Sequence, residues 1–134
     1  MSKFDEAIQE SLNAGQDYLT ALQDLDDLVR ELDDALRKAT GGAVVIERQF
    51  AASTQDLRRR AFVDARGGGG AMRTLWEVAF SPDGYPVKVI APDESLFLCV
   101  TRDDLEQTFL KLLRQGATGR QIKVLQEAST KQAS

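Results

Sequence analysis

A long amphipathic helix at the N-terminus constrains this chain more than any other feature. Ser2 followed by Asp5 is a typical helix start, and Gly41-Gly42 supplies a left-handed stop. An unbroken helix over residues 3–39 would be ~55 Å long. A compact domain of 134 residues has a diameter of only ~36 Å. Such a helix would extend past its own domain and leave leucines in water.

Two arrangements would resolve this mismatch. The helix breaks at Gly15 and folds back, or a second subunit covers the extension. From Leu22 onward the apolar spacing is 3, 4, 3, 4, which is a heptad pattern. We favour the second arrangement, a homodimer with coiled-coil character, because the heptad continues through Leu36 without a polar gap. The predicted interface comprises Leu22, Leu25, Val29, Leu32 and Leu36.

The middle of the chain, residues 43–100, predicts an antiparallel sheet. Segments rich in β-branched and aromatic residues alternate with turn signals such as Ser81-Pro82-Asp83-Gly84. The expected strands are 43–50, 57–65, 73–80, 86–91 and 96–100. The continuously apolar last segment predicts a central strand covered on both faces. Four consecutive glycines, Gly67 to Gly70, predict a mobile loop. Tyr85, at a hairpin tip, is expected to be exposed, and Trp76 to lie in the core.

Two helices are expected to close the chain over residues 102–128. Thr101 with Asp104 predicts the start of the first, and Thr118 with Gln121 the start of the second. The tail from Ser129 onward is expected to fray. The fold class is therefore α+β, in one domain over 1–134. It comprises an acidic heptad-like helix (1–40), an antiparallel four- to five-stranded meander sheet (43–100) and two short C-terminal helices (102–128).

Composition excludes several classes of protein. The chain has no histidine, which removes His-dependent triads and the usual zinc and haem sites. One cysteine cannot form an internal disulfide, so a disulfide-stapled secreted scaffold is excluded. No apolar run reaches the ~18 residues of a membrane span, and residues 1–10 lack a signal-peptide pattern. We expect a cytoplasmic protein without a membrane segment and without a cofactor.

Charge is distributed unevenly along the sequence. Residues 1–39 carry ten acidic and four basic residues, a net charge of −6, whereas residues 48–73 carry six arginines against two aspartates, a net charge of +4. Arginines beside a glycine run predict a candidate phosphate site, formed by Arg58, Arg60, Arg73, Gly68 and Gly69. The simpler interpretation is that these arginines pair with the acidic helix, and we favour it.

Other residues give weaker signals for chemistry. Cys99 lies in an apolar run and has no histidine to act as its base, so we expect a buried structural thiol. Asp103, Asp104 and Glu106 could bind magnesium, but carboxylates in a first helical turn also complement the helix dipole, which is the simpler interpretation.

The functional hypothesis that follows is a small, non-enzymatic, homodimeric protein-binding protein of the inhibitor, immunity-factor, chaperone or adaptor type. Its partner is expected to be a protein of unknown identity. The alternative is a nucleotide- or nucleic-acid-binding module that holds a phosphate-bearing ligand through the arginine-rich strand and the glycine run. A metal-dependent hydrolase using the carboxylates of residues 103–106 ranks third.

Overall fold

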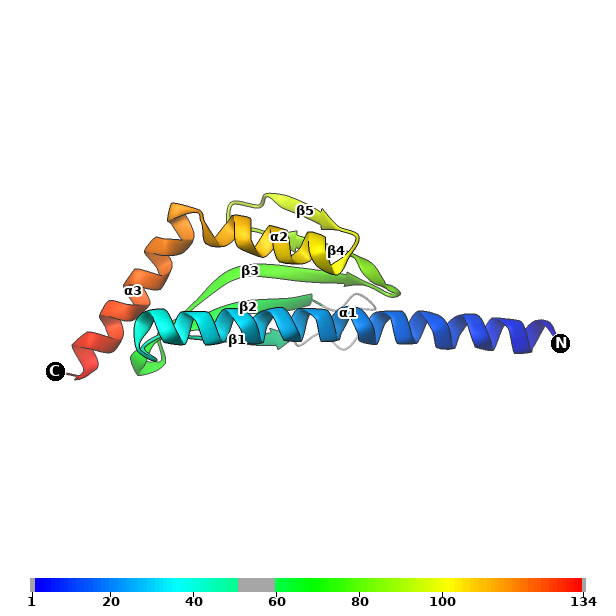
Figure 1. The fold of residues 1–134 in the computed structure, drawn as a ribbon, viewed down its shortest axis with the longest axis horizontal. Coiled ribbons are helices and arrows are strands. Elements are labelled where there is room, and N and C mark those ends of the chain that lie inside the picture. Colours follow the sequence, from blue (N-terminus) through cyan, green and yellow to red (C-terminus); the bar gives the residue numbers. More distant parts are fainter. Residues whose placement is uncertain (1, 51–59, 134) are drawn as a thin grey trace.

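The computed structural model describes residues 2–50 and 60–133 and shows the expected α+β arrangement. A long helix is followed by a five-stranded antiparallel sheet with strands in sequential order, and two C-terminal helices complete the chain (Figure 1). The helices are α1 (Lys3–Thr40), α2 (Arg102–Leu113) and α3 (Gly116–Ala133). The strands are β1 (Val45–Phe50), β2 (Arg60–Arg66), β3 (Met72–Ser81), β4 (Gly84–Ile90) and β5 (Leu96–Cys99).

Helix α1 is continuous through Gly15, so it does not fold back. Ser2 Oγ accepts the Asp5 N–H at 3.1 Å, while the Asp5 carboxylate accepts the Ser2 N–H at 3.1 Å, which satisfies donors of the first turn. Gly41, at φ 63°, ends the helix and donates its N–H to Arg37 O. The C-terminal half of α1 lies along the sheet, and the N-terminal part projects beyond it (Figure 1).

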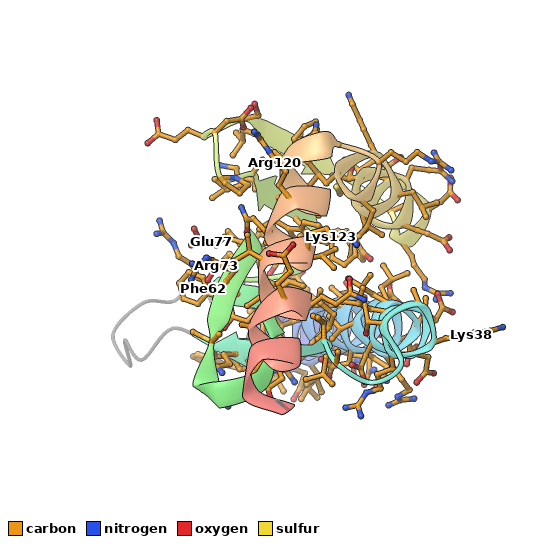
Figure 2. The ribbon with its side chains drawn as sticks, turned by 90° about the vertical axis from the view of Figure 1, so that its left-hand side faces the viewer. Lys38, Phe62, Arg73, Glu77, Arg120 and Lys123 are labelled. Atoms are coloured by element: carbon orange, nitrogen blue, oxygen red, sulfur yellow. The ribbon has the colours of Figure 1, made fainter. Side chains whose placement is uncertain are left out.

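The core lies between one face of the sheet and the helices α1 and α2. Alternate residues of each strand face it, for example Val63, Val78 and Val89, all fully buried. Trp76, 1% exposed, packs on Phe109 of α2 with ring centroids 5.0 Å apart, as a core position should. On the opposite face, called here the outer face of the sheet, none of the described helices covers the central strands. Helix α3 crosses one end of the molecule, where it contacts the η1 turn, β2 and β3 (Figures 1 and 2).

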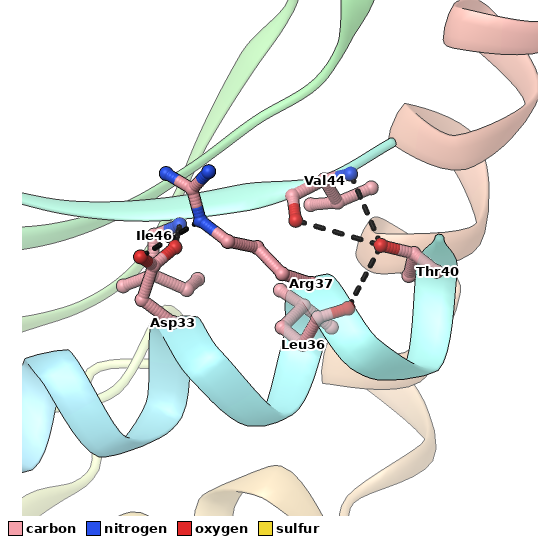
Figure 3. A network of polar contacts seen from close by, with 6 residues as sticks. All are labelled: Asp33, Leu36, Arg37, Thr40, Val44 and Ile46. Carbon is pink, nitrogen blue, oxygen red and sulfur yellow. Dashed lines mark hydrogen bonds and ion pairs between the residues drawn. The ribbon is translucent and has the colours of Figure 1, made fainter. Parts of the chain in front are cut away.

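Polar contacts join α1 to β1 where the chain turns from helix to sheet (Figure 3). Asp33 Oδ1 accepts the backbone N–H of Ile46 at 2.8 Å, and its other oxygen accepts Arg37 Nε at 2.9 Å. Thr40 Oγ1 donates to Leu36 O at 2.8 Å and accepts the Val44 N–H at 3.1 Å. These bonds fix the direction in which the first strand leaves the helix.

Two predictions about the last strand and the tail are wrong. β5 is an edge strand that pairs with β4 alone, and Leu96 and Leu98 are exposed rather than covered on both faces. The tail is helical through Ala133, and Ser129 is bonded rather than frayed. Its hydroxyl accepts the Gly68 N–H at 2.6 Å and donates to Ala43 O at 2.9 Å.

Two predictions about turns are also wrong. Gly68–Gly70 forms a short 3₁₀ turn, η1, packed against α3, instead of a mobile loop. Tyr85 is half-buried because its hydroxyl reaches α1 and donates to Asp24 Oδ2 at 2.8 Å. In both cases a helix distant in sequence holds the turn, and local composition carries no information about that contact.

Candidate functional site

The predicted phosphate residues do not form one site in the part of the chain that the structure describes. Arg58 lies outside the described residues. Arg60 pairs with Ala79 in the sheet, whereas Arg73 pairs with Ala65. Six residues of β3 therefore separate the two arginines, about 20 Å along the strand. A single phosphate cannot bridge that distance.

The arginines are also engaged by groups of their own chain. Arg60 forms an ion pair with Glu77 at 3.5 Å, and a guanidinium nitrogen of Arg73 donates to Met72 O at 3.0 Å. Figure 2 shows Arg73 beside Phe62 and Glu77, with Lys38 across the molecule on α1 and Arg120 on α3. The labelled basic side chains are thus dispersed and do not converge on one point.

The glycine run serves packing. A Cβ on Gly67 would meet Leu125 O at 2.6 Å, and one on Gly68 would meet the Ser129 Cα at 2.9 Å. Gly69, at φ 71°, needs the left-handed region. The absence of side chains lets α3 lie directly on this turn, and the Gly68 N–H is already bonded to Ser129. Nothing in this arrangement forms a phosphate cradle.

Among the described arginines of residues 48–73, Arg48 forms the predicted pair with the acidic helix. Arg48 of β1 contacts the carboxylate of Asp26 through two nitrogens, with Nε–Oδ1 2.5 Å and Nη2–Oδ2 3.2 Å. Its guanidinium also lies 4.2 Å from the centre of the Phe50 ring. Arg66 and Arg60 pair instead with Glu47 and Glu77 of neighbouring strands. These arginines are thus paired with carboxylates of their own chain.

The carboxylates and the thiol offer no reactive group among the described residues. The Asp104 carboxylate accepts the backbone N–H of Val100 at 3.0 Å. The backbone N–H of Asp104 in turn donates to Thr101 Oγ1 at 3.2 Å. Within the described ranges no cluster of three metal-ligating side chains is found. Cys99 is 0% exposed, and burial raises the pKa of its thiol, which disfavours the nucleophilic thiolate.

The predicted interface residues lie inside the molecule. Leu25, Val29, Leu32 and Leu36 are buried in the core between α1 and the sheet, and Leu22 is half-buried beside them. The heptad spacing is therefore used for contacts within one chain. A second subunit has no access to these four side chains in this fold.

Two groups of exposed apolar side chains stand out among the described residues. The sequence predicts that the overhanging helix leaves apolar residues in water, but the predicted interface includes neither group. The first, called here the α1 stripe, runs along the projecting part of α1. It consists of Phe4, Ile8, Leu12 and Leu19, which are 81%, 58%, 62% and 56% exposed. Their spacing of four, four and seven residues places them on one face of the helix. This spacing can be read from the sequence, but the predicted interface was placed in the heptad that begins at Leu22 because its spacing is more regular.

The second exposed apolar surface is on β5. Leu96 and Leu98 are each more than half exposed and point to the outer face, and Val100, which follows the strand, is also more than half exposed. Beside them the outer face has a shallow hollow of about 370 Å³, lined in part by Phe62, Glu77 and Ile90. Ile90 is the sheet neighbour of Leu96, so the hollow adjoins the β5 surface.

No family model matches the chain, and no curated protein or solved structure shows significant similarity to it. Among the described residues, none of the helices combines the length and apolar character needed to cross a bilayer. The two exposed apolar surfaces are therefore the features of the molecule that indicate a function.

Proposed function

We propose that this chain is a small cytoplasmic, non-enzymatic protein that binds other proteins and self-associates as a homodimer through the α1 stripe. The observation that carries the proposal is the exposure of Phe4, Ile8, Leu12 and Leu19 on a helix that projects from the body (Figure 1). A soluble monomer rarely leaves such a contiguous row of large apolar side chains in water. The single cysteine, present as a free thiol, supports the reducing compartment.

Charge around the α1 stripe favours a second copy of this chain as its occupant. At about 100° per residue, the acidic residues Glu6, Glu10 and Asp17 fall on the opposite side of the helix. Asp5 lies next to the stripe, but its carboxylate is bonded to the Ser2 backbone. Two copies can therefore meet along the stripe while their acidic faces stay in water.

The residues that flank the α1 stripe also suit contact between two helices. One flank is formed by small side chains and the other by neutral polar ones: Ala7, Ser11 and Ala14, then Gln9 and Gln16. Small flanking residues let helix backbones approach closely. No flanking residue other than Asp5 supplies a charge that would select a charged partner.

An antiparallel pair fits the side-chain sizes along the α1 stripe. With the two-fold axis between residues 11 and 12, Phe4 of one copy faces Leu19 of the other. Ile8 then faces Gly15, where a Cβ would meet nothing within 4 Å in the single chain. Each apolar side chain thus meets either another apolar side chain or a small residue along the contact.

The proposed dimer can be tested by its mass. We expect sedimentation equilibrium at micromolar concentration to give twice the chain mass of 14.8 kDa. Leu12→Glu should return the protein to a monomer and weaken self-association at least 100-fold, or about 3 kcal/mol, because it would bury a charge in an apolar contact. Asn13→Glu introduces the same glutamate one residue further along, on the other side of the helix, and should leave the dimer intact.

Cross-linking tests the orientation of the dimer. Leu12→Cys should form an intersubunit disulfide under mild oxidation, because residue 12 lies close to its own counterpart at the two-fold axis. Phe4→Cys should not, since the two copies of residue 4 lie at opposite ends of an antiparallel pair. A monomeric wild-type protein would refute the dimer, and efficient cross-linking at both positions would refute the antiparallel arrangement.

A further inference from the structure

The edge of the sheet at β5 has backbone hydrogen-bonding groups without a partner strand. β5 pairs with β4 in the register Val89↔Phe97 and Val87↔Cys99, and it has no neighbour on its other side among the described strands. Ala91 N donates to Ser95 O at 2.9 Å, which places residues 91 and 95 at a hydrogen-bonded position of the ladder, although the Ser95 N–H donates to Asp93 Oδ1 at 3.0 Å. Because such pairs alternate in an antiparallel ladder, Phe97 and Cys99 direct their N–H and C=O groups toward β4.

The same alternation directs the backbone N–H and C=O groups of Leu96 and Leu98 away from β4. The free edge ends at Val100, since its N–H is bonded to the Asp104 carboxylate. Natural proteins cover or blunt such edges with charged residues, proline or bulges. Between Leu96 and Val100 this strand carries none of these, and its side chains are Leu, Phe, Leu, Cys and Val.

Side chains on both faces of this edge indicate what it would bind. On the outer face, Leu96 and Leu98 are 58% and 59% exposed and adjoin the hollow at Ile90. Lys88, the sheet neighbour of Leu98, is exposed on that face. On the other face the Lys111 ammonium lies 5.2 Å from the centre of the Phe97 ring. Neither lysine forms an ion pair with a described residue.

We propose that β5 binds an extended segment of a partner protein, rich in apolar and acidic side chains, as a sixth strand of the sheet. This proposal depends on the protein-binding role proposed above and names the partner's recognition element. The segment would form backbone bonds to Leu96 and Leu98, place apolar side chains on the outer face, and bring carboxylates to Lys88 and Lys111.

A second copy of this chain is the weaker choice for this edge. A copy of β5 would bring no carboxylate, because residues 96–100 carry no charge. Two self-complementary contacts on one chain, at the α1 stripe and at β5, would also give open-ended assemblies in place of a closed dimer. The test below separates this outcome from binding of a partner.

The experiment is a selection of peptides on the immobilised full-length protein from a displayed library of random twelve-residue peptides. We expect enriched sequences that alternate apolar and acidic residues. A fluorescein-labelled synthetic peptide of the enriched sequence should bind in solution. On binding, amide exchange measured by NMR should slow at Leu96 and Leu98 and stay unchanged at Phe97, whose N–H is already in the ladder.

Variants at one position separate the backbone contribution from that of the side chain. Leu98→Pro removes a free N–H and leaves the bonds to β4, as proline can on a sheet edge, so peptide affinity should fall at least tenfold. Leu98→Val should keep affinity within about threefold, since it retains the N–H and an apolar side chain. Leu98→Asp, which also keeps the N–H, should weaken binding by repelling the peptide's carboxylates, and it covers the case in which the proline variant fails to fold.

Several results would overturn the proposal. These are no enriched sequence, enriched peptides that bind without protecting Leu96 and Leu98, or binding that none of the three substitutions alters. Assemblies larger than a dimer that Leu98→Asp returns to dimers would assign the edge to a second copy. Loss of the dimer on Leu12→Glu reports on the α1 stripe, whereas the Leu98 substitutions report on the β5 edge, so failure of this proposal and failure of the proposed dimer give different results.

Discussion

Single residues decide how closely α1 can approach the sheet. Gly84, at the tip of the β3–β4 hairpin, has φ 92° and lies under α1. A Cβ there would meet Asp17 O at 2.7 Å and the Ala21 Cβ at 3.0 Å. Both the backbone conformation and the available space therefore require glycine at this position.

We predict that Gly84→Ala destabilises the protein by about 2–4 kcal/mol, because the added methyl group meets backbone and the residue is strained at positive φ. Urea unfolding followed by circular dichroism measures this change. Gly119→Ala is the control, since nothing lies within 4 Å of its Cβ position in α3. There the change should stabilise by about 0.5–1 kcal/mol, as alanine is the better helix former. Equal effects at the two glycines would contradict the close approach at Gly84.

The phenol of Tyr85 links the hairpin to α1 through its bond to Asp24. Burial is the largest cause that raises the pKa of Tyr85 above its ordinary value, followed by the hydrogen bond to the Asp24 carboxylate. The folded protein therefore holds this proton more tightly than the unfolded chain. The stability that it contributes is complete below about pH 10 and is lost as the pH rises further.

We predict that Tyr85→Phe lowers the unfolding free energy by about 1–2 kcal/mol at pH 7, because it removes a hydrogen bond to a charged group. The wild type should then lose more stability than the variant between pH 9 and pH 11. Urea titrations of both proteins at several pH values provide the comparison. Parallel pH profiles for the two proteins would show that Tyr85 is not the group responsible.

Among the elements, α3 depends on contacts that are distant in sequence. Ser129 bonds the glycine turn at Gly68 and, at Ala43, the segment that joins α1 to β1. Leu125 is fully buried and lies against Gly67. This helix docks through its last turns as well as its first, which explains why local reasoning placed its end too early.

We predict that Ser129→Ala destabilises the protein by about 1–3 kcal/mol, because it leaves a backbone N–H and a C=O without their partner. Glu127→Ala, an exposed change in the same helix turn, should stay within about 0.5 kcal/mol of the wild type. Thermal unfolding by calorimetry measures both. If Ser129→Ala had the stability of the wild type, the tail would be frayed, as the sequence predicted.

At the scale of the whole molecule, the opposite charges of the two halves are partly neutralised within the fold. Arg48 and Asp26 join the basic sheet to the acidic helix, while the other paired arginines of the sheet use acids on neighbouring strands. The remaining charge is dispersed, and the net charge is −4. This distribution does not favour binding to a polyanion.

We predict that a fluorescent single-stranded oligonucleotide does not bind at about 50 mM salt, because the described arginines of residues 48–73 are separated and form contacts within their own chain. Fluorescence anisotropy with protein at up to about 100 times the probe concentration is a sufficient test. Binding that weakens steeply as salt rises would contradict this expectation and restore the phosphate-binding alternative.

The fold could be predicted from the sequence further than the site could. The helix boundaries at Ser2 and Gly41, the five strands and the start of α2 at Thr101 follow from capping, periodicity and turn chemistry, which act over a few residues. The candidate site could not be predicted this way. Leu25 and Leu12 are both apolar residues of one helix, yet Leu25 is fully buried and Leu12 is 62% exposed.

The sequence by itself determined the elements, their order and an amphipathic helix longer than its domain, because local interactions between near neighbours decide those features. Only the tertiary structure decided which apolar residues remain available. It assigned the heptad after Leu22 to the chain's own sheet, left the α1 stripe in water and placed Leu98 on an open edge. The physical reason is that burial depends on which surfaces meet, and strand order and helix placement determine those contacts across the whole chain.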